Sequence, residues 1–378
     1  MVVTPIRSHP QVLEFFAGVG LARMGLDNAG FHTAWANDIS EDKAAMYRAQ
    51  FKDDVMEVGD VGAVRGQDLP IGASLAWASS PCTDLSLAGG RKGLAGRESS
   101  AFYSFISVLE GMAELPPTVV LENVLGLASS HGGDDLTAAI KAFNDLGYSV
   151  DILAIDARRF VPQSRPRMFL VGSLSPVAES DEPHELRPAW SDAFFGDETL
   201  RTHRAPLPPV DDLVTDGLGD TVQKLSADDS RWWPADRVAK FVASMSPVQR
   251  TRLDHHMAGD SLTWRTAYRR TRGGKAVWEM RADDVAGCLR TARGGSSKQA
   301  VVQMGHGKVA VRWMTGVEYA RLMGADDYRI DGFRDSQVQF AFGDAVAVPA
   351  VQWLAENYLM PLVRGALTTD RDDQARVV

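Results

Sequence analysis

The residue of greatest chemical interest is Cys82, one of two cysteines in a chain of 378 residues. It lies in "SSPCTDLS" (79–86), directly after Pro81 and the apolar run "ASLAWA" (73–78), which is typical of a buried strand. A cysteine at the exit of a strand can act as a nucleophile when a nearby cation stabilises its thiolate. An inert, packed thiol is the ordinary alternative. The second cysteine, Cys288, follows no such proline or strand.

A glycine turn near the N-terminus is a candidate ligand site. In "VLEFFAGVGLARMGLDNAG" (12–30), an apolar run leads through Gly18 and Gly20 into a helical pattern. Glycines at such a turn let the backbone approach a ligand at the positive end of the helix, although the third glycine of the dinucleotide fingerprint is missing. Asp38 and Asp60 follow the next two predicted strands, where carboxylates can bond an adenosine. Since the turn carries no lysine, S-adenosylmethionine fits better than NAD or ATP; a tight packing turn is the alternative.

Short apolar runs alternate with amphipathic stretches over the first 172 residues, which predicts an α/β fold with a doubly wound, Rossmann-like sheet. The predicted strands are 12–16, 33–36, 74–79, 119–121 and 168–171. Cys82 and Glu122 follow the fourth and fifth strands, counting a short third strand before Asp60. Both should therefore lie at the carboxyl edge of the sheet, where open α/β sheets hold their sites.

The rhythm stops after Gly172, where several prolines break up an acidic segment and indicate a second unit. The formal charge of −9 argues mildly against a nucleic-acid partner. However, residues 231–281 are strongly basic, and "WRTAYRRTRGGK" (264–275) interleaves arginines with aromatic residues. Helical patterns return at 315–324 and 345–359, and the last residues read as a frayed tail.

Six motifs, taken together, resemble in order and spacing those of the DNA cytosine-5 methyltransferases. The resemblance covers about residues 11–172 and 310–357. The motifs are "FFAGVG" (15–20), "SSPC" (79–82) with "AGGRKGL" (88–94), "LENV" (121–124), "PQSRPR" (162–167), "EYARLMG" (318–324) and "FGDAV" (342–346).

The resemblance implies a covalent mechanism on a cytosine that has been extruded from the duplex. Cys82 matches the cysteine that adds to C6 of the base, and Glu122 matches the acid that bonds N3. Arg165 and Arg167 match the arginines that hold the base and the backbone. A methyl group is then transferred to C5, a base removes the C5 proton, and the thiol leaves.

The same matching implies a set of cofactor contacts in which Phe16 packs on the adenine, Asp38 holds the ribose and Asp60 holds the adenine amino group. The full set for S-adenosylmethionine is Phe16, Gly18, Gly20, Asp38, Ile39, Asp60, Val61, Asp344 and Ala345. The implied contacts with double-stranded DNA are Ser86, Arg91, Lys92, Arg97, Gln163, Arg269, Arg270, Arg272, Arg290, Thr291 and Arg293. No metal ion is implied.

The chain departs from the family pattern at several positions. Glu14 stands where the family usually has aspartate. Thr83 follows the Pro-Cys pair in place of the usual glutamine, and Asp344 replaces the asparagine of the family's "GNSV". The last two departures bear on contacts near the flipped base and on cofactor affinity or identity.

By motif order, residues 1–172 and 305–365 form the catalytic domain, 173–304 the target-recognition domain and 366–378 a tail. We predict a sequence-specific enzyme, paired with a restriction endonuclease or standing alone, and the resemblance implies a monomer. We expect a cytoplasmic protein, since no apolar run is long enough to span a membrane and the N-terminus lacks the basic-then-apolar pattern of a signal peptide. Two alternatives stay open: a catalytically silent or altered-cofactor DNA-binding relative, and the tRNA-methylating branch, against which the long insert argues.

Overall fold

The computed structural model describes residues 9–81, 100–291 and 298–368. The chain forms two compact units. The first comprises Met1–Ile155, Pro166–Val210 and Ala350–Val378, and the second Asp156–Arg165 and Asp211–Pro349. These units are defined by packing, whereas the predicted catalytic and target-recognition domains are defined by motif order and stay a prediction.

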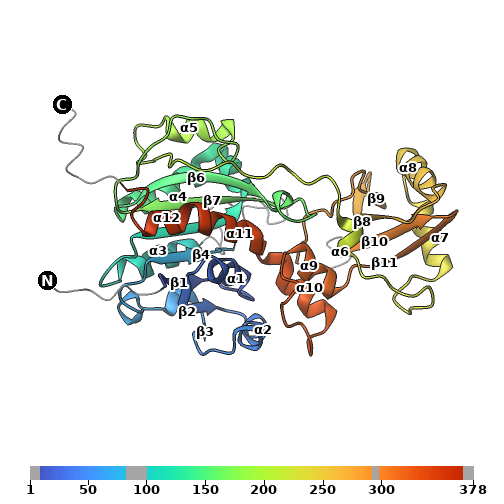
Figure 1. Cartoon of the computed structure of the whole chain (residues 1–378), viewed down its shortest axis with the longest axis horizontal. Coiled ribbons are helices and arrows are strands. Elements are labelled where there is room, and N and C mark those ends of the chain that lie inside the picture. The colour runs from blue at the N-terminus through green and yellow to red at the C-terminus, as the bar shows by residue number, and fades with distance from the viewer. Residues whose placement is uncertain (1–8, 82–99, 292–297, 369–378) are drawn as a thin grey trace. The chain divides into compact units, whose positions relative to one another are not determined.

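The first unit is built on a seven-stranded sheet with the order β3-β2-β1-β4-β5-β7-β6 (Figure 1). Neighbouring strands from β3 to β5 run parallel, while β7 runs antiparallel to β5. The strands are β1 (Gln11–Phe15), β2 (His32–Asp38), β3 (Met56–Val58), β4 (Leu75–Ala78), β5 (Thr118–Val124), β6 (Ser149–Asp156) and β7 (Pro166–Ser173). The predicted doubly wound α/β sheet is confirmed, with β6 as an element that the sequence patterns did not reveal.

Helices α3 (Ser100–Glu110) and α4 (Asp134–Asp145) pack on this sheet through a shared apolar core that includes Phe105 and Phe143. Helices α1 (Leu21–Asn28) and α2 (Glu41–Phe51) follow β1 and β2. Helix α2 begins where the Ser40 hydroxyl accepts a hydrogen bond from the Lys43 N–H. The unit also contains α5 (Asp192–Phe195), α12 (Met360–Val363), and short turns at Val61–Ala63, Gly66–Asp68, Leu125–Gly133 and Ala189–Ser191.

The second unit contains a four-stranded antiparallel sheet with the order β11-β10-β8-β9. Its strands are β8 (Thr263–Arg272), β9 (Lys275–Met280), β10 (Gln299–Gly305) and β11 (Lys308–Trp313). Helices α7 (Ala235–Ala243) and α8 (Pro247–Met257) contribute Phe241 and Leu253 to an apolar core with residues of this sheet. The other helices are α6 (Leu218–Thr221), α9 (Gly316–Leu322) and α10 (Asp335–Asp344), and a short turn lies at Ala157–Arg159.

Helix α11 (Val348–Leu354) continues through a π-helical turn at Ala355–Leu359 into α12. This helix confirms the one predicted at 345–359, and α9 confirms the one predicted at 315–324. The continuous stretch Asp335–Val363 is apolar and long enough to pass for a membrane span, but 67% of its most apolar window is buried within the protein. Burial of this kind is what a core helix shows.

Candidate active site

Two strand ends in the first unit carry the acid and one arginine of the predicted catalytic group. Glu122 lies on β5, and Arg167 lies near the start of the neighbouring antiparallel strand β7. The Arg167 Nε atom is 3.0 Å from the Glu122 Oε1 atom, and both side chains are largely buried. An ion pair shielded from water in this way holds the carboxyl group in one orientation.

The segment that leads to Cys82 is tied to the same strand end. The Asn123 side chain donates a hydrogen bond of 3.2 Å to the Ser80 hydroxyl, two residues before the cysteine. The Ser79 hydroxyl accepts a bond of 3.0 Å from the Trp77 indole N–H. Cys82 itself lies outside the described residues. The described contacts therefore fix the end of the chain from which the cysteine extends.

The glycine turn after β1 has the backbone geometry that a close approach requires. Phe16, Gly18 and Gly20 all have positive φ angles of 56°, 58° and 78°. The Asp38 carboxylate accepts bonds of 2.8 Å from the Gly18 N–H and from the Ser40 N–H. Asp38 thus braces the turn as well as standing at the strand end where a ribose contact is predicted.

The remaining predicted cofactor residues of this unit lie on the loops after β2 and β3. Ile39 is 72% exposed, an unusual position for a large apolar side chain beside the buried Asp38. Asp60 accepts a bond of 2.8 Å from the Gly62 N–H, which begins the turn Val61–Ala63. The loop between β3 and β4 is thereby fixed next to the predicted cofactor residues.

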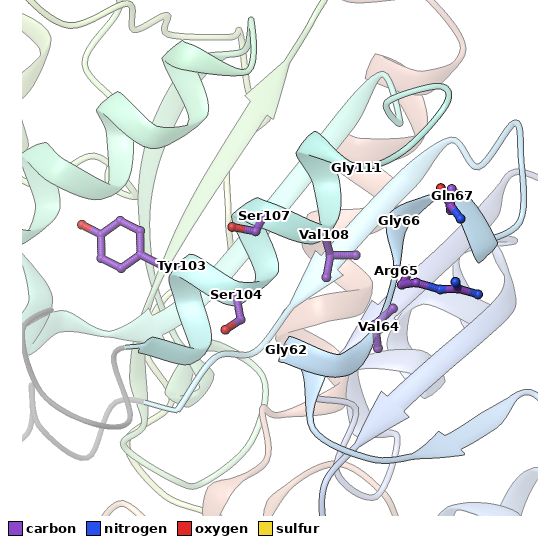
Figure 2. Close-up of a pocket in the computed structure, with 10 residues that line it drawn as sticks. All are labelled: Gly62, Val64, Arg65, Gly66, Gln67, Tyr103, Ser104, Ser107, Val108 and Gly111. Atoms are coloured by element: carbon purple, nitrogen blue, oxygen red, sulfur yellow. The ribbon is translucent and has the colours of Figure 1, made fainter.

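A cavity of about 630 Å³ lies between this loop and helix α3. Figure 2 shows Ser104, Ser107 and Tyr103 on the helix and Arg65 and Gln67 on the loop. Phe16, Asp38 and Asp60 do not line the cavity. The cavity therefore adjoins the loop after β3, and it is distinct from the glycine turn and from the predicted cofactor residues Phe16, Asp38 and Asp60.

Arg165 lies in the second unit and is fully buried. Its guanidinium donates hydrogen bonds to the carbonyls of Leu289, Gly343 and Ala345 and to the Cys288 Sγ atom. These bonds join the predicted "CLRT" junction to the "FGDAV" motif. A contact between Arg165 and a bound base would have to be made in addition to them.

Gln163 is also fully buried. Its Nε2 atom donates a hydrogen bond of 2.7 Å to the Leu322 carbonyl, and its Oε1 atom accepts one of 3.1 Å from the Leu289 N–H. A direct contact between Gln163 and DNA, as predicted, would require these bonds to be exchanged.

The two predicted cofactor residues of the second unit, Asp344 and Ala345, directly follow Gly343 of the "FGDAV" motif. A side chain at Gly343 would overlap the backbone of Arg290 and Thr291. Asp344 is exposed and Ala345 half-buried. Glycine at 343 is therefore required by the close approach of two backbone segments.

The predicted DNA contacts fall into two groups. Arg269, Arg270 and Arg272 lie exposed on the β8–β9 hairpin, and Arg290 is exposed on the junction. Thr291 is half-buried beside Arg290, and Gln163 is the buried residue described above. Five further predicted DNA contacts lie outside the described residues, as do Thr83 and Asp84: Ser86, Arg91, Lys92, Arg97 and Arg293.

Two features of the site were not predicted from the sequence. A hydrogen bond between Asn123 and Ser80 links the two strand ends of the candidate site, and Glu14 is buried beneath the glycine turn with Tyr47 and Arg23. A polar residue next to Glu122 on a buried strand was the available signal for Asn123.

In residues 9–81, 100–291 and 298–368, no three His, Cys, Asp or Glu side chains gather as a metal site would require.

The sequence matches the description "C-5 cytosine-specific DNA methylase" over residues 11–359. The chain belongs to this family. The match spans both compact units, so the glycine turn, the Glu122–Arg167 pair and the buried Arg165 are all parts of a methylase. The enzyme class, DNA (cytosine-5-)-methyltransferase, follows from the family.

Named relatives of the methylase include enzymes of two kinds. It is 24% identical to the Type II methyltransferase M.Bsp6I of Bacillus sp. over 92% of this chain and 98% of the relative. It is 31% identical to the orphan methyltransferase M.Rho11sI of Bacillus phage rho11s over 46% of this chain and 35% of the relative.

Solved structures show the same fold at low identity. The Entamoeba histolytica methyltransferase EhMeth matches with a TM-score of 0.63 and 14% identity over 96% of this methylase and 100% of that chain. The S. pombe Dnmt2 methyltransferase matches with a TM-score of 0.59 and 17% identity, over 94% and 99% of the two chains.

Proposed function

We propose that this methylase transfers a methyl group from S-adenosylmethionine to C5 of a cytosine in double-stranded DNA, within a specific sequence, through a covalent adduct with Cys82. The observation that carries the proposal is the buried Glu122–Arg167 pair at two strand ends, linked through Asn123 to Ser80 just before Cys82. This brings the acid, a cation and the approach to the nucleophile to one edge of one sheet.

In the proposed reaction, the Cys82 thiolate forms a bond to C6 of the extruded cytosine, and the electron pair of the C5–C6 double bond makes C5 nucleophilic. The Glu122 carboxyl group donates a proton to N3, which neutralises the negative charge that builds on the ring, and Arg167 stabilises the carboxylate that is left. N3 returns this proton to Glu122 when the thiolate leaves. When bound, S-adenosylmethionine supplies the electrophilic methyl group. A base then removes the C5 proton, the pair re-forms the double bond and the thiolate leaves.

The residues of the first unit suit an adenosine ligand without a phosphate chain. The turn at Gly18 and Gly20 exposes backbone, and the Asp38 carboxylate is held beside it by two N–H groups. We assign the ribose to Asp38, the adenine to Phe16, Ile39 and Val61, and the adenine amino group to Asp60. Asp344 and Ala345 complete the proposed cofactor set.

Arg165 and Gln163 receive a positioning role in this proposal, since their side chains are bound to backbone of their own unit. We propose that residues 173–304 read the DNA sequence, with Arg269, Arg270, Arg272, Arg290 and Thr291 among its contacts. We further propose a monomer that acts in the cytoplasm, with a cognate restriction endonuclease or as an orphan enzyme, like the two kinds of relatives.

The test is to incubate the protein with S-adenosylmethionine and unmethylated duplex DNA, digest the DNA to nucleosides and identify any modified base by mass. We expect 5-methylcytosine, and none from Cys82→Ala. Cys288→Ser is the matched control, because Cys288 is the only other cysteine, and it should keep forming product. Transfer RNA serves as a parallel substrate.

The outcomes of this experiment distinguish the proposed function from its two alternatives. Product in DNA that depends on Cys82 supports the proposal, and sequencing the modified DNA then gives the target site. Methylation confined to RNA would favour the tRNA-methylating branch. DNA binding without any modified base would favour the silent or altered-cofactor relative and direct attention to Asp344.

A further inference from the structure

A buried polar network lies beneath the glycine turn of the first unit. Glu14, near the end of β1, is fully buried. Its Oε1 atom accepts a bond of 3.2 Å from the Arg23 N–H, and its Oε2 atom accepts 3.1 Å from the Tyr47 hydroxyl. Arg23 lies in the first turn of α1, whose N-cap Gly20 has no side chain to offer. Glu14 therefore supplies, from outside the helix, an acceptor and a negative charge at its positive end.

The Arg23 side chain closes the network from the other direction. It is 5% exposed and donates 3.1 Å to the Tyr47 hydroxyl. It also pairs with Asp53 and Asp27 and stacks on the Phe51 ring at 4.0 Å. The bonds thus run from α1 to α2 and to the loop that follows α2.

The hydrogens of this network can be assigned from its donors. A guanidinium only donates, so the Tyr47 oxygen accepts from Arg23, and the hydrogen of Tyr47 is left for Glu14. Both Glu14 oxygens then act as acceptors, which suits the carboxylate. If Glu14 were protonated at Oε2, both Arg23 and Glu14 would point a hydrogen at the Tyr47 oxygen. The Tyr47 hydrogen would then lose its acceptor. The network is complete only when Glu14 is ionised.

The network bears directly on the shape of the turn. A Cβ atom at Gly20 would lie 2.8 Å from the Tyr47 ring and closer still to the Phe51 ring. The turn therefore rests on the two aromatic side chains that the network holds. A shift of the Tyr47 ring toward the turn would press on the backbone of Gly20.

We propose that Glu14 is a positioning residue whose ionisation, transmitted through Tyr47 and Arg23, sets the shape of the glycine turn and makes cofactor affinity rise with pH. The inference rests on the proposed function, in which this turn binds S-adenosylmethionine. It concerns how the site is regulated rather than which residues touch the cofactor.

The electrostatic surroundings place this ionisation in a neutral to alkaline range. Burial raises the pKa of Glu14 to about 8, against the opposing effects of the Arg23 charge and the Tyr47 hydroxyl. Burial also raises the pKa of Asp27, whereas the hydrogen bond from Arg23 lowers the pKa of Asp53. The charge of His32 acts on both of these aspartates. With a pKa of about 8, Glu14 changes charge between neutral and alkaline pH.

The experiment is a calorimetric titration of the full chain with S-adenosylmethionine between pH 6.5 and 9, in buffers of different ionisation enthalpy. If only the ionised form binds, affinity should rise about tenfold from pH 7 to pH 9, because the competent fraction rises by that factor. Binding near pH 7 should release close to one proton. Glu14→Gln should lack both the added pH dependence and the proton release.

Two further variants separate a regulatory role from a merely structural one. Tyr47→Phe keeps the ring under Gly20 but removes a bond that stabilises the carboxylate, so the rise in affinity should move to higher pH. Tyr148→Phe removes the hydroxyl of another buried tyrosine of the unit, which bonds the Pro116 carbonyl, and should leave the profile unchanged. The amino group of the cofactor titrates equally with every variant and cancels in the comparison.

Identical pH profiles for the wild type, Glu14→Gln and Tyr47→Phe would overturn the inference while leaving the proposed function intact. An absence of S-adenosylmethionine binding at every pH would instead count against the proposed function. A thermal unfolding curve for each variant identifies any that fails to fold. If Glu14→Gln fails, Tyr47→Phe decides, and if Tyr47→Phe fails, Glu14→Gln decides.

Discussion

At the scale of single residues, the proposed catalytic edge and the proposed cofactor turn use buried polar groups in different ways. Glu122 and Arg167 form one short ion pair at the site itself. Asp38 and Glu14 bind backbone N–H groups of the turn and of α1, so they support its conformation. Substitution of Asp38 or Glu14 will therefore remove a hydrogen bond and also disturb the backbone conformation of the turn.

The two glycines of the turn should differ in how much a methyl group costs. Both have positive φ, which costs an alanine about 1 kcal/mol. At Gly18 the nearest atom to an added Cβ is the Lys43 Cδ at 4.0 Å, whereas at Gly20 the Tyr47 ring is 2.8 Å away. Overpacking adds about 1–3 kcal/mol. We expect urea unfolding to show a loss of about 1 kcal/mol for Gly18→Ala and about 2–4 kcal/mol for Gly20→Ala; equal losses would contradict the packing argument.

At the scale of elements, the β8–β9 hairpin is the described element best suited to a nucleic-acid groove. Among the described residues, strand β10 pairs with β8 as far as Tyr268, and Arg269 to Arg272 pair with β9. A two-stranded ribbon of this kind fits the major groove of DNA. Alternation along β8 places Arg270 and Arg272 on one face, where both pair with Glu279, and Arg269 on the other.

We expect Arg269→Ala to weaken DNA binding and to reduce the slope of log affinity against log salt by about 0.9, as the loss of one phosphate contact does. Arg250→Ala is the control, since Arg250 is a half-exposed arginine on α8 that pairs with Asp254. Fluorescence anisotropy with a labelled duplex at several salt concentrations measures both. An unchanged slope for Arg269→Ala would remove the hairpin from the proposed interface.

For the whole molecule, the periodic and motif-bearing parts were predictable and the buried connections were not. Strands β1, β2, β4, β5 and β7 follow apolar runs that are evident in the sequence, and the order of strand ends correctly placed Glu122 beside the edge that leads to Cys82. The partners of buried polar groups come from residues far apart in sequence. The bonds of Arg165 to residues 289–345 and those of Glu14 to Arg23 and Tyr47 therefore left no periodic signal.

One such connection ties the C-terminal segment to the first unit. Asp151 is fully buried and accepts hydrogen bonds from Arg187 and from the Tyr358 hydroxyl, at 3.1 Å from the latter. Tyr358 has only one hydrogen and gives it to Asp151, so the His203 Nε2 atom, 2.8 Å from the Tyr358 oxygen, must donate. The His203 Nδ1 atom then accepts from the Ser149 hydroxyl at 2.9 Å. The network is satisfied with a neutral histidine.

This network should make the first unit less stable in mild acid. Burial lowers the pKa of His203, so below pH 6.5 the unfolded chain binds a proton that the native state does not. Stability then falls by up to about 1.4 kcal/mol for each pH unit until the native histidine also protonates, while above pH 6.5 this group has no effect. Urea unfolding between pH 5 and pH 7.5 should show a shallower acid loss for His203→Gln than for the wild type. The exposed His255 provides the control substitution to glutamine, and an equal acid loss in wild type and His203→Gln would assign the acid sensitivity to other groups.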